Sequence, residues 1–356
     1  MGSIKKILST NLKEKYKDAK KIPFGRIFTD YMLKMEYNPE EGWHDMTIEP
    51  YSPLQMDPAS TVLHYAQAIF EGMKAYKDKE GNIRLFRPEE NFKRMNVSAE
   101  RMKIPQFDGE EVLRGLEELL LMEKDWIPDE EGTSLYIRPT IIATDPFLGV
   151  KPSDTYLFFI ILCPVGPYYA EGFNPISISV EDQYVRAVKG GTGNVKAAGN
   201  YAASLYAAAN AKKRGYTQVL WLDGIEHKYI EEVGSMNIFF EFNDEIATPE
   251  LNGSILPGIT RKSVIDMARA MGKKVTERPI SIDEVFDRFE KGELLEVFGS
   301  GTAAVVSPVG KLDWHGRVIT VNNGESGETT LKLFHELCGI QNGSVEDKYG
   351  WSHVVK

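Results

Sequence analysis

The hydrophobic positions of the chain follow two periods, which predicts a mixture of helices and strands. An apolar stripe at helical spacing runs through residues 109–126 and predicts an amphipathic helix. Residues 88–102 predict a second helix, because Pro88 stands at the first turn and two glutamates follow it directly. Residues 201–213 and 260–271 predict two more, and each is followed by a glycine that ends it.

Shorter apolar or alternating segments predict strands, and several of these are joined by tight turns. Asp223 with Gly224, and Asn243 with Asp244, each separate two such segments and so predict β-hairpins. The longest apolar run, residues 156–165, has about half the length of a membrane-spanning helix and predicts a buried strand. The segments predicted as strands are residues 26–37, 73–76, 83–86, 134–144, 155–163, 176–180, 218–222, 227–230, 236–242 and 245–248.

This mixture predicts an α+β protein of two domains, since 356 residues are long for one core and sufficient for two. Residues 164–175 contain three prolines, two glycines and two adjacent tyrosines, which favours an ordered interdomain connection with a lid role over a strand. The expected division is a small domain over residues 1–163, with a solvated or disordered tail at 1–21, and a larger domain over 176–356.

Composition narrows the class of protein without identifying it. A net charge of -10 and a pI near 5.3 disfavour a nucleic-acid-binding protein. Cys163 and Cys338 lie far apart and the six histidines show no ligand spacing, so neither a disulfide framework nor a metal site is expected. The first 21 residues lack both an apolar signal region and the Arg-rich character of a transit peptide. We therefore expect a cytoplasmic protein that binds neither nucleic acid nor membrane.

The most informative segment is VKGGTGNVKAAGNY, residues 188–201, in which Lys196 follows a glycine-rich stretch and precedes an alanine-rich helix. The segment matches neither GxxxxGK[ST] nor GxGxxG, the common phosphate-binding patterns. A lysine that bonds covalently to a carbonyl compound must be accessible and must lose its proton, which burial and neighbours promote. Taken alone, Lys196 is more simply a surface lysine.

Three further segments supply what a pyridoxal phosphate cofactor requires, namely a carboxylate at the ring nitrogen and donors for the phosphate. Glu231 and Glu232 precede an apolar strand in EEVGSMNIFF. Residues 256–261, LPGITR, place a glycine before a helix start, where backbone N–H groups bind anions. Residues 299–309, GSGTAAVVSPV, add a turn of small residues with a threonine hydroxyl. Taken separately, the three segments are more simply explained as a solvated strand end, a helix cap and a turn, in that order.

Together these segments resemble the branched-chain aminotransferases of the fold-type IV pyridoxal phosphate enzymes. The resemblance runs from FGRIFTDYM near residue 24 to FHELCGIQNG near residue 343, and it includes HYAQAIFEGMKAY (64–76) and LYIRPTIIATDPFLGV (135–150). It implies the two-domain fold of the D-amino acid aminotransferase type, with a small α/β domain and a larger mixed α/β domain of barrel-like form. It also implies a homodimer, and IIATDPFLGV is similar to the bacterial form found in Firmicutes.

The resemblance implies a role for each residue at the cofactor. Lys196 would hold pyridoxal phosphate as a Schiff base and act as the catalytic base. Glu232, rather than Glu231, would bind the ring nitrogen, and Tyr201 would donate to the phenolic oxygen. The groups implied at or near the phosphate are Arg94, Arg186, Ile259, Thr260, Gly301 and Thr302.

The same resemblance implies a substrate pocket with aromatic walls, which suits the side chains of leucine, isoleucine and valine. Arg138 is the candidate for meeting the carboxylate of glutamate, since an unpaired buried carboxylate is costly. Tyr65 would reach the site of the neighbouring subunit. The residues implied to line or frame the pocket are Phe24, Phe70, Tyr136, Arg138, Tyr168, Ser235 and Ala303.

The expected activity is therefore transamination between branched-chain L-amino acids and 2-oxoglutarate. One alternative is another reaction of the same fold, as in D-amino acid aminotransferases or aminodeoxychorismate lyases. A second alternative is a non-catalytic protein that keeps the fold for binding. The animal enzymes carry a redox CxxC after the GSGTA turn, but Ala304 and Ser307 stand at those positions here, so thiol control is not implied.

Overall fold

The computed structural model describes residues 4–167 and 173–356 and divides the chain into two compact units. The first unit comprises Met1–Ala170, Lys196–Ala198 and Gly339–Lys356, and the second comprises Glu171–Val195 and Gly199–Cys338. The segment around Lys196 therefore clusters with the first unit, although the residues on both sides of it belong to the second. Tyr168, predicted in the substrate pocket, lies outside the described residues.

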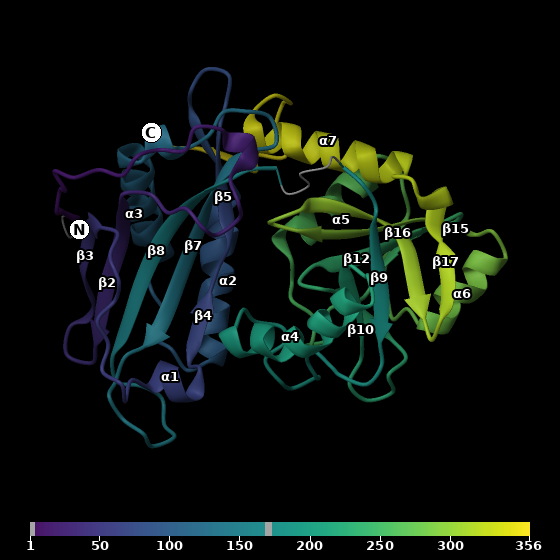
Figure 1. The fold of residues 1–356 in the computed structure, drawn as a ribbon, viewed down its shortest axis with the longest axis horizontal. Coiled ribbons are helices and arrows are strands. Elements are labelled where there is room, and N and C mark those ends of the chain that lie inside the picture. Colours follow the sequence, from purple (N-terminus) through teal and green to yellow (C-terminus); the bar gives the residue numbers. More distant parts are fainter. Residues whose placement is uncertain (1–3, 168–172) are drawn as a thin grey trace. The chain divides into compact units, whose positions relative to one another are not determined.

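A nine-stranded sheet forms the framework of the first unit (Figure 1). Its strands are β1 (Lys5–Lys6), β2 (Tyr31–Asn38), β3 (Gly42–Pro50), β4 (Ala68–Phe70), β5 (Met73–Lys77), β6 (Ile83–Phe86), β7 (Ser134–Ala143), β8 (Tyr156–Val165) and β18 (Ser352–Val354). They pair in the order β1-β3-β2-β8-β7-β5-β6-β18, and β4 also pairs with β7. Only β1 and β3 run parallel among these pairs.

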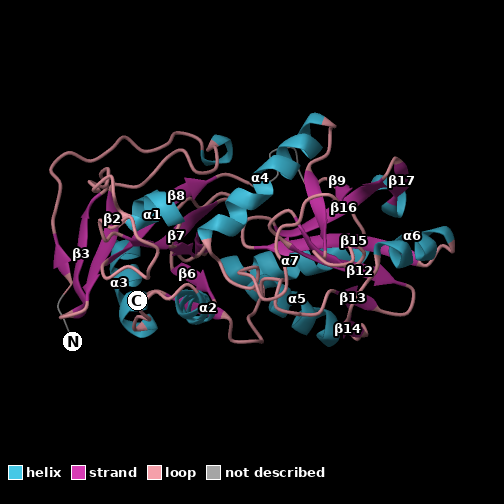
Figure 2. Ribbon diagram, turned by 90° about the horizontal axis from the view of Figure 1, so that it is seen from below, coloured by secondary structure: helices cyan, strands magenta, loops and turns pink. Residues whose placement is uncertain are grey.

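Two amphipathic helices bury their apolar faces against this sheet. The helices of the first unit are α1 (Thr61–Tyr65), α2 (Pro88–Arg101) and α3 (Gly109–Met122). Helix α3 contacts α2 and β2, and α2 contacts β4; Figure 2 shows α2 and α3 on the same side of the strands. Asp108 begins α3 as its N-cap, because its carboxylate accepts from the N–H groups of Glu110 and Glu111 at 2.9 and 3.1 Å.

The second unit also contains a nine-stranded sheet. Its strands are β9 (Ile176–Glu181), β10 (Gln218–Leu222), β11 (Ile230–Val233), β12 (Asn237–Phe242), β13 (Ile246–Thr248), β14 (Val275–Glu277), β15 (Leu294–Gly301), β16 (Val305–Trp314) and β17 (Arg317–Thr320). The order is β11-β10-β9-β16-β15-β12-β13-β14, and β17 pairs with β16. The helices are α4 (Ala198–Lys213), α5 (Ile259–Ala270), α6 (Ile282–Glu290) and α7 (Glu328–Asn342), of which α7 continues into the first unit.

Most predicted elements are present, but β2 begins at Tyr31 and not at residue 26 as predicted, and β11 also differs from its prediction. The sequence predicted a strand over residues 227–230, whereas β11 covers Ile230–Val233. The shift has a local cause: the Asp223 carboxylate accepts from the N–H groups of Ile225, Glu226, Lys228 and Tyr229 and so holds the preceding residues in a turn. Glu231 and Glu232 therefore lie inside a buried strand and not in front of one.

At both ends of the chain the structure adds a strand to the first sheet that the sequence did not predict. The tail predicted as solvated adds β1 to the first sheet, and the N–H of Lys13 donates to Asp30 Oδ1 at 2.7 Å. At the other end, β18 pairs with β6 of the first sheet, so residues 339–356 cluster with the first unit although the sequence assigned them to the larger domain. Within residues 4–167 and 173–356, no helix has the length and apolar character needed to cross a membrane.

Candidate active site

Lys196 is fixed through its backbone in the first unit. Its N–H donates to Ser98 Oγ of α2 at 3.1 Å, and its carbonyl accepts from the N–H of Phe70 at 3.2 Å. The next residue, Ala197, forms a β-bridge with Ile69 of β4. The half-buried side chain places its Nζ 4.7 Å from the centroid of the Phe70 ring. The amine thus lies beside an aromatic wall while the backbone is held from two sides.

The same aromatic ring is contacted by a guanidinium group. Arg138 places its Cζ 4.6 Å from the Phe70 centroid and donates from Nη2 to Tyr136 Oη at 3.0 Å. Phe24 packs edge-on against Tyr136, with centroids 5.0 Å apart. Gly72 makes room for this arrangement, since a Cβ there would lie 2.2 Å from Tyr136 Oη. Phe24, Phe70, Tyr136 and Arg138, all predicted in the pocket, therefore form one cluster.

Three other predicted pocket residues lie outside this cluster. Tyr65 is 41% exposed, and its hydroxyl donates to the carbonyl of Leu148. Ser235 is exposed in the turn between β11 and β12, and Ala303 lies in the turn between β15 and β16. The last two belong to the second unit.

Glu232 of β11 is a buried carboxylate that contacts Arg186 and Asn237 of the second unit. It is 3% exposed, and its Oε2 lies 2.5 Å from Arg186 Nη2. Its Oε1 accepts from Asn237 Nδ2 at 3.2 Å. Arg186 Nη2 also donates to the carbonyls of Ser254 and Gly193 at 2.7 and 3.2 Å. Attraction to Arg186 favours a negative charge on Glu232 in this dry environment.

Glu231 points to the opposite face of β11, because neighbouring side chains of a strand alternate between its two faces. It is also 3% exposed, and its Oε1 accepts from Ser254 Oγ. Its buried Oε2 has no hydrogen-bond partner among the described residues. Burial raises the pKa of Glu231, although Ser254 and Arg186 oppose the shift. Adjacent carboxylates of one strand are thus suited to different states of charge.

The predicted phosphate-binding segments of the second unit converge on Asn237. Helix α5 begins after Gly258 without a side-chain cap, and a Cβ on Gly258 would lie 2.1 Å from Asn237 Oδ1. Asn237 Nδ2 donates to the carbonyl of Leu256 at 2.9 Å. Asn237 also pairs with Ser300 across β12 and β15, next to the turn that follows Gly301. The amides of Ile259 and Thr260 and the Thr302 turn are therefore positioned by the asparagine that also bonds Glu232.

The other cofactor residues have local partners of their own. Arg94 of α2 forms a bidentate ion pair with Glu71, with Nε to Oε1 at 2.7 Å and Nη2 to Oε2 at 2.9 Å. Tyr201 is half-buried in the first turns of α4. Beside it, Asn200 Nδ2 donates to the carbonyls of Thr192 and Val195 at 2.7 and 2.9 Å and so fixes the glycine-rich loop before the lysine.

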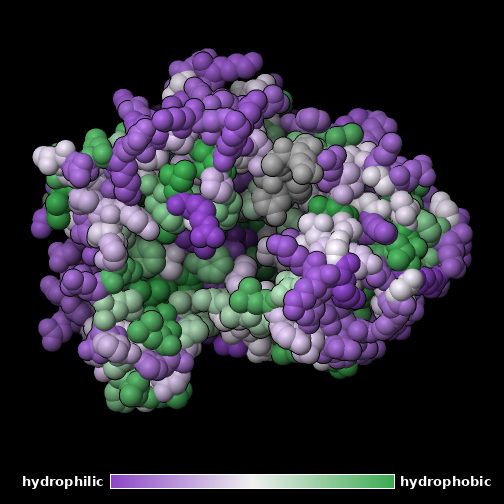
Figure 3. Space-filling view, in the orientation of Figure 1, coloured by the Kyte–Doolittle hydropathy of each residue, from purple (hydrophilic) through white to green (hydrophobic). Residues whose placement is uncertain are grey.

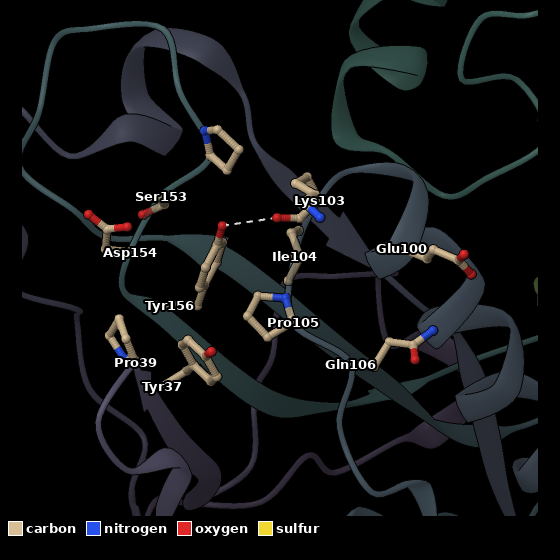
Figure 4. Close-up of a pocket in the computed structure, with 11 residues that line it drawn as sticks. Tyr37, Pro39, Glu100, Lys103, Ile104, Pro105, Gln106, Ser153, Asp154 and Tyr156 are labelled. Atoms are coloured by element: carbon tan, nitrogen blue, oxygen red, sulfur yellow. Dashed lines mark hydrogen bonds between the residues drawn. The ribbon is translucent and has the colours of Figure 1, made fainter.

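A cavity of about 510 Å³ in the first unit contains none of these residues (Figure 4). Tyr37, Tyr156 and Lys103 lie along it, and the Tyr156 hydroxyl donates to the carbonyl of Lys103 at 3.2 Å. It is a feature of the surface at the end of α2 and is separate from the predicted site.

Comparison with known proteins decides the family. The model of the family described as "Amino-transferase class IV" matches residues 68–312. The chain belongs to the class IV aminotransferases. It is 57% identical over 346 residues to "Branched-chain-amino-acid aminotransferase 2" of Bacillus subtilis, covering 97% of this chain and 95% of that protein. The predicted resemblance to the branched-chain group of this family, in its Firmicutes form, is confirmed.

Solved structures of class IV aminotransferases confirm the predicted fold class. The Escherichia coli branched-chain amino acid aminotransferase superposes with a TM-score of 0.76 at 28% identity and covers 92% of this chain and 99% of its own. The branched-chain amino acid aminotransferase of "T.th.", solved with pyridoxamine 5'-phosphate, has a TM-score of 0.75 at 27% identity and covers 91% and 98%.

Sequence reasoning missed three polar residues that organise the site of this aminotransferase. Asn237 donates to Glu232, Glu71 accepts from Arg94, and Asn200 holds the loop before Lys196 through the carbonyls of Thr192 and Val195. Asn237 had a local signal, since an asparagine inside the apolar run MNIFF has no reason to be buried unless it bonds other groups. Glu71 had the weaker signal of a lone acidic residue between apolar strands.

Proposed function

We propose that this enzyme transfers the amino group between branched-chain L-amino acids and 2-oxoglutarate, with pyridoxal 5'-phosphate as its cofactor. The observation that carries the proposal is the near full-length similarity to a protein named branched-chain-amino-acid aminotransferase. Aromatic and apolar groups around Lys196 in the first unit support a substrate with an apolar side chain. The alternatives of the same fold, and a non-catalytic role, are disfavoured by the same match.

The donor groups of the second unit fit pyridoxal phosphate in two respects. Glu232 is a buried carboxylate held by Arg186 and Asn237, which suits a protonated ring nitrogen. The uncapped start of α5, with Ile259 and Thr260, offers backbone N–H groups to a phosphate. Ser300 Oγ, buried and without a partner among the described residues, lies beside Gly301 and Thr302 and adds a polar group there.

We assign the chemistry of the reaction to five residues of this chain. When bound, pyridoxal phosphate supplies a carbonyl carbon that takes the amino group and a ring that withdraws electron density from the substrate. Lys196 Nζ would hold that carbon between turnovers and would move the proton at the substrate Cα. Glu232 would keep a proton on the ring nitrogen, and Tyr201 would donate to the phenolic oxygen. Arg94 binds the phosphate, while Arg186 maintains the charge of Glu232.

The apolar walls of the pocket are assigned to Phe24, Phe70 and Tyr136 of the first unit, which would bury the methyl groups of leucine, isoleucine or valine. Tyr168, Ser235 and Ala303 are assigned to the substrate from the resemblance alone. Arg138 is assigned to the side-chain carboxylate of glutamate, since its guanidinium lies over the Phe70 ring that Lys196 also contacts. One pocket can then take an apolar and an acidic side chain in alternate half-reactions.

Lys196→Ala tests the assignment directly. We expect the variant to bind pyridoxal phosphate through its phosphate contacts, to lose the visible absorbance of the lysine-bound cofactor, and to lose nearly all transamination of L-leucine with 2-oxoglutarate. Lys189→Ala, on the same segment, is the matched control and should keep both. Near-wild-type turnover in Lys196→Ala would refute the assignment, and preference for D-alanine over L-leucine in the wild type would favour the D-amino acid alternative.

We also propose that the enzyme is a cytoplasmic homodimer. Apolar side chains gather at one end of the first unit, near α1 and the loop after β7, where Figure 3 shows them as a green patch. Leu63, Phe147, Leu148 and Val150 are 59%, 45%, 60% and 87% exposed there, more than an isolated surface residue explains. Tyr65 lies in the same region, which supports its assignment to the neighbouring subunit's site.

A further inference from the structure

Glu71 is a fully buried carboxylate that the proposed reaction leaves without a role. It lies between β4 and β5 and is 0% exposed. Besides its two bonds to Arg94, its Oε2 accepts from Asn91 Nδ2 at 2.8 Å and from the N–H of Gly72 at 3.1 Å. Four donors on one carboxylate are what a charged group requires in an apolar interior.

The charges around Glu71 keep it ionised. Burial alone would raise the pKa of Glu71, but Arg94, Lys196 and Asn91 together hold it below its usual value. Arg94 meets it side-on, through Nε and Nη2, so the guanidinium cannot turn without breaking both bonds. By covalent geometry the Nη1 edge then points away from Glu71, and this is the edge that we assign to the cofactor phosphate.

One face of α2 carries the partners of both Glu71 and Lys196. Asn91, Arg94 and Ser98 are spaced by three and four residues and so share a face of the helix. The first two bond Glu71, and Ser98 Oγ accepts from the N–H of Lys196. Ser98 Oγ also donates to the carbonyl of Arg94 at 3.1 Å. Glu71 therefore docks onto the helix face that holds the reactive lysine.

From this geometry we propose that Glu71 is a positioning residue: it fixes the Arg94 guanidinium in the orientation that binds the cofactor phosphate. This inference rests on the proposed function, in which Arg94 binds the cofactor phosphate. By charge alone a carboxylate near a phosphate would weaken binding of the anion. Positioning and charge thus predict opposite effects of removing the carboxylate, which makes the proposal open to a direct test.

The experiment compares the binding of pyridoxal 5'-phosphate and of pyridoxal to the cofactor-free protein by absorbance titration. The affinity for pyridoxal 5'-phosphate divided by the affinity for pyridoxal measures the contribution of the phosphate. This ratio can be measured without catalytic turnover. We expect Glu71→Gln to lower this ratio about tenfold or more, on the scale found when a supporting residue is removed. We expect the double variant Glu71→Gln/Arg94→Gln to be no worse than Arg94→Gln, because both changes remove the same interaction.

The outcomes distinguish a failure of the positioning role of Glu71 from a failure of the phosphate role of Arg94. If Arg94→Gln lowers the ratio but Glu71→Gln leaves it unchanged or raises it, the positioning role is refuted while the phosphate role of Arg94 stands. If Arg94→Gln itself has no effect, the phosphate assignment fails, and the inference falls with it. Glu90→Gln removes a carboxylate from the surface of the same helix and should leave the ratio unchanged.

Asn91→Ala keeps the test valid if Glu71→Gln does not fold. This variant removes one hydrogen bond to Glu71 and leaves its ion pair with Arg94 in place. We expect a smaller fall in the ratio, of about threefold. An unchanged ratio in a folded Asn91→Ala protein, with a wild-type melting temperature, would count against the proposal.

Discussion

At the scale of single residues, β11 places two carboxylates side by side and gives them different surroundings. Glu232 is paired with Arg186, whereas burial raises the pKa of Glu231 and its Oε1 accepts from Ser254 Oγ. Ser254 connects the two environments, because its carbonyl also accepts from Arg186. The alternation of a strand thus gives the two carboxylates of one dipeptide different surroundings, with Glu232 beside a cation and the pKa of Glu231 raised by burial.

Substitution by glutamine should therefore affect the two positions very differently. Glu232→Gln removes the charge proposed to hold the proton on the ring nitrogen, and we expect kcat to fall about 100-fold. Glu231→Gln replaces an acid that burial favours in its neutral form by a neutral side chain of the same shape, and we expect kcat within about threefold of wild type. Steady-state kinetics with L-leucine measures both, and the reverse order of damage would mean that Glu231 is the carboxylate at the ring.

Substitution of Arg138 tests how one pocket accepts both the apolar side chain of leucine and the acidic side chain of glutamate. Arg138→Met keeps an unbranched side chain over Phe70 but removes the cation, so we expect the 2-oxoglutarate half-reaction to lose about 2 kcal/mol of transition-state stabilisation, on the scale of a charged hydrogen bond. The leucine half-reaction should change much less. Single-turnover kinetics of each half-reaction separates the two, and equal losses would show that Arg138 binds the shared α-carboxylate or has only a structural role.

At the scale of elements, local sequence signals were sufficient where one residue sets a boundary. Pro88 correctly predicted the start of α2, and Gly272 correctly predicted the end of α5. The prediction failed at β11, because the side chain of Asp223 extends the preceding turn by hydrogen bonds that no periodicity reveals. The burial of Glu232 was missed for the same reason, since its strand was displaced by three residues.

The end of α3 contains a carboxylate that should make stability depend on pH. Burial raises the pKa of Glu123 from 4.5 to about 7, with Asp30 adding to the shift and the N–H of Tyr31 opposing it. Below the unfolded pKa the group is protonated in both states and has no effect. Between the unfolded pKa of 4.5 and the folded pKa of about 7, the folded protein resists ionisation of Glu123. The free energy of unfolding therefore falls as the pH rises through this range, by at most about 3 kcal/mol, and it levels off above the folded pKa.

Urea unfolding of wild type and of Glu123→Gln at pH 5 and pH 8 tests this expectation. The variant cannot ionise at this position and still offers an oxygen to the N–H of Tyr31, so it should be relatively more stable than wild type at the higher pH. Glu118→Gln, a surface change on the same helix, is the control. A difference between wild type and Glu123→Gln that does not vary with pH would show that Glu123 titrates normally.

At the scale of the whole molecule, pairings between distant segments were beyond prediction from the sequence. The resemblance identified Arg186 and Glu232 separately, but only the folded second unit brings them into an ion pair. Likewise β18 joins the first sheet from the far end of the chain, and nothing in its local pattern specifies β6 as its neighbour. Such contacts are set by how complete sheets pack and twist, whereas helix caps and turns are set by a few neighbouring residues.

The apolar patch of the first unit should decide the oligomeric state. Light scattering should give twice the chain mass of 40.1 kDa for the wild type. Leu148→Asp would place an unpaired carboxylate in the proposed interface, and we expect the dissociation constant to rise about 30-fold or more. Val318→Asp makes the same change at an exposed apolar position of β17 in the second unit and should leave the mass unchanged. A wild-type monomer, or a dimer that tolerates Leu148→Asp, would show that this patch does not form the subunit interface.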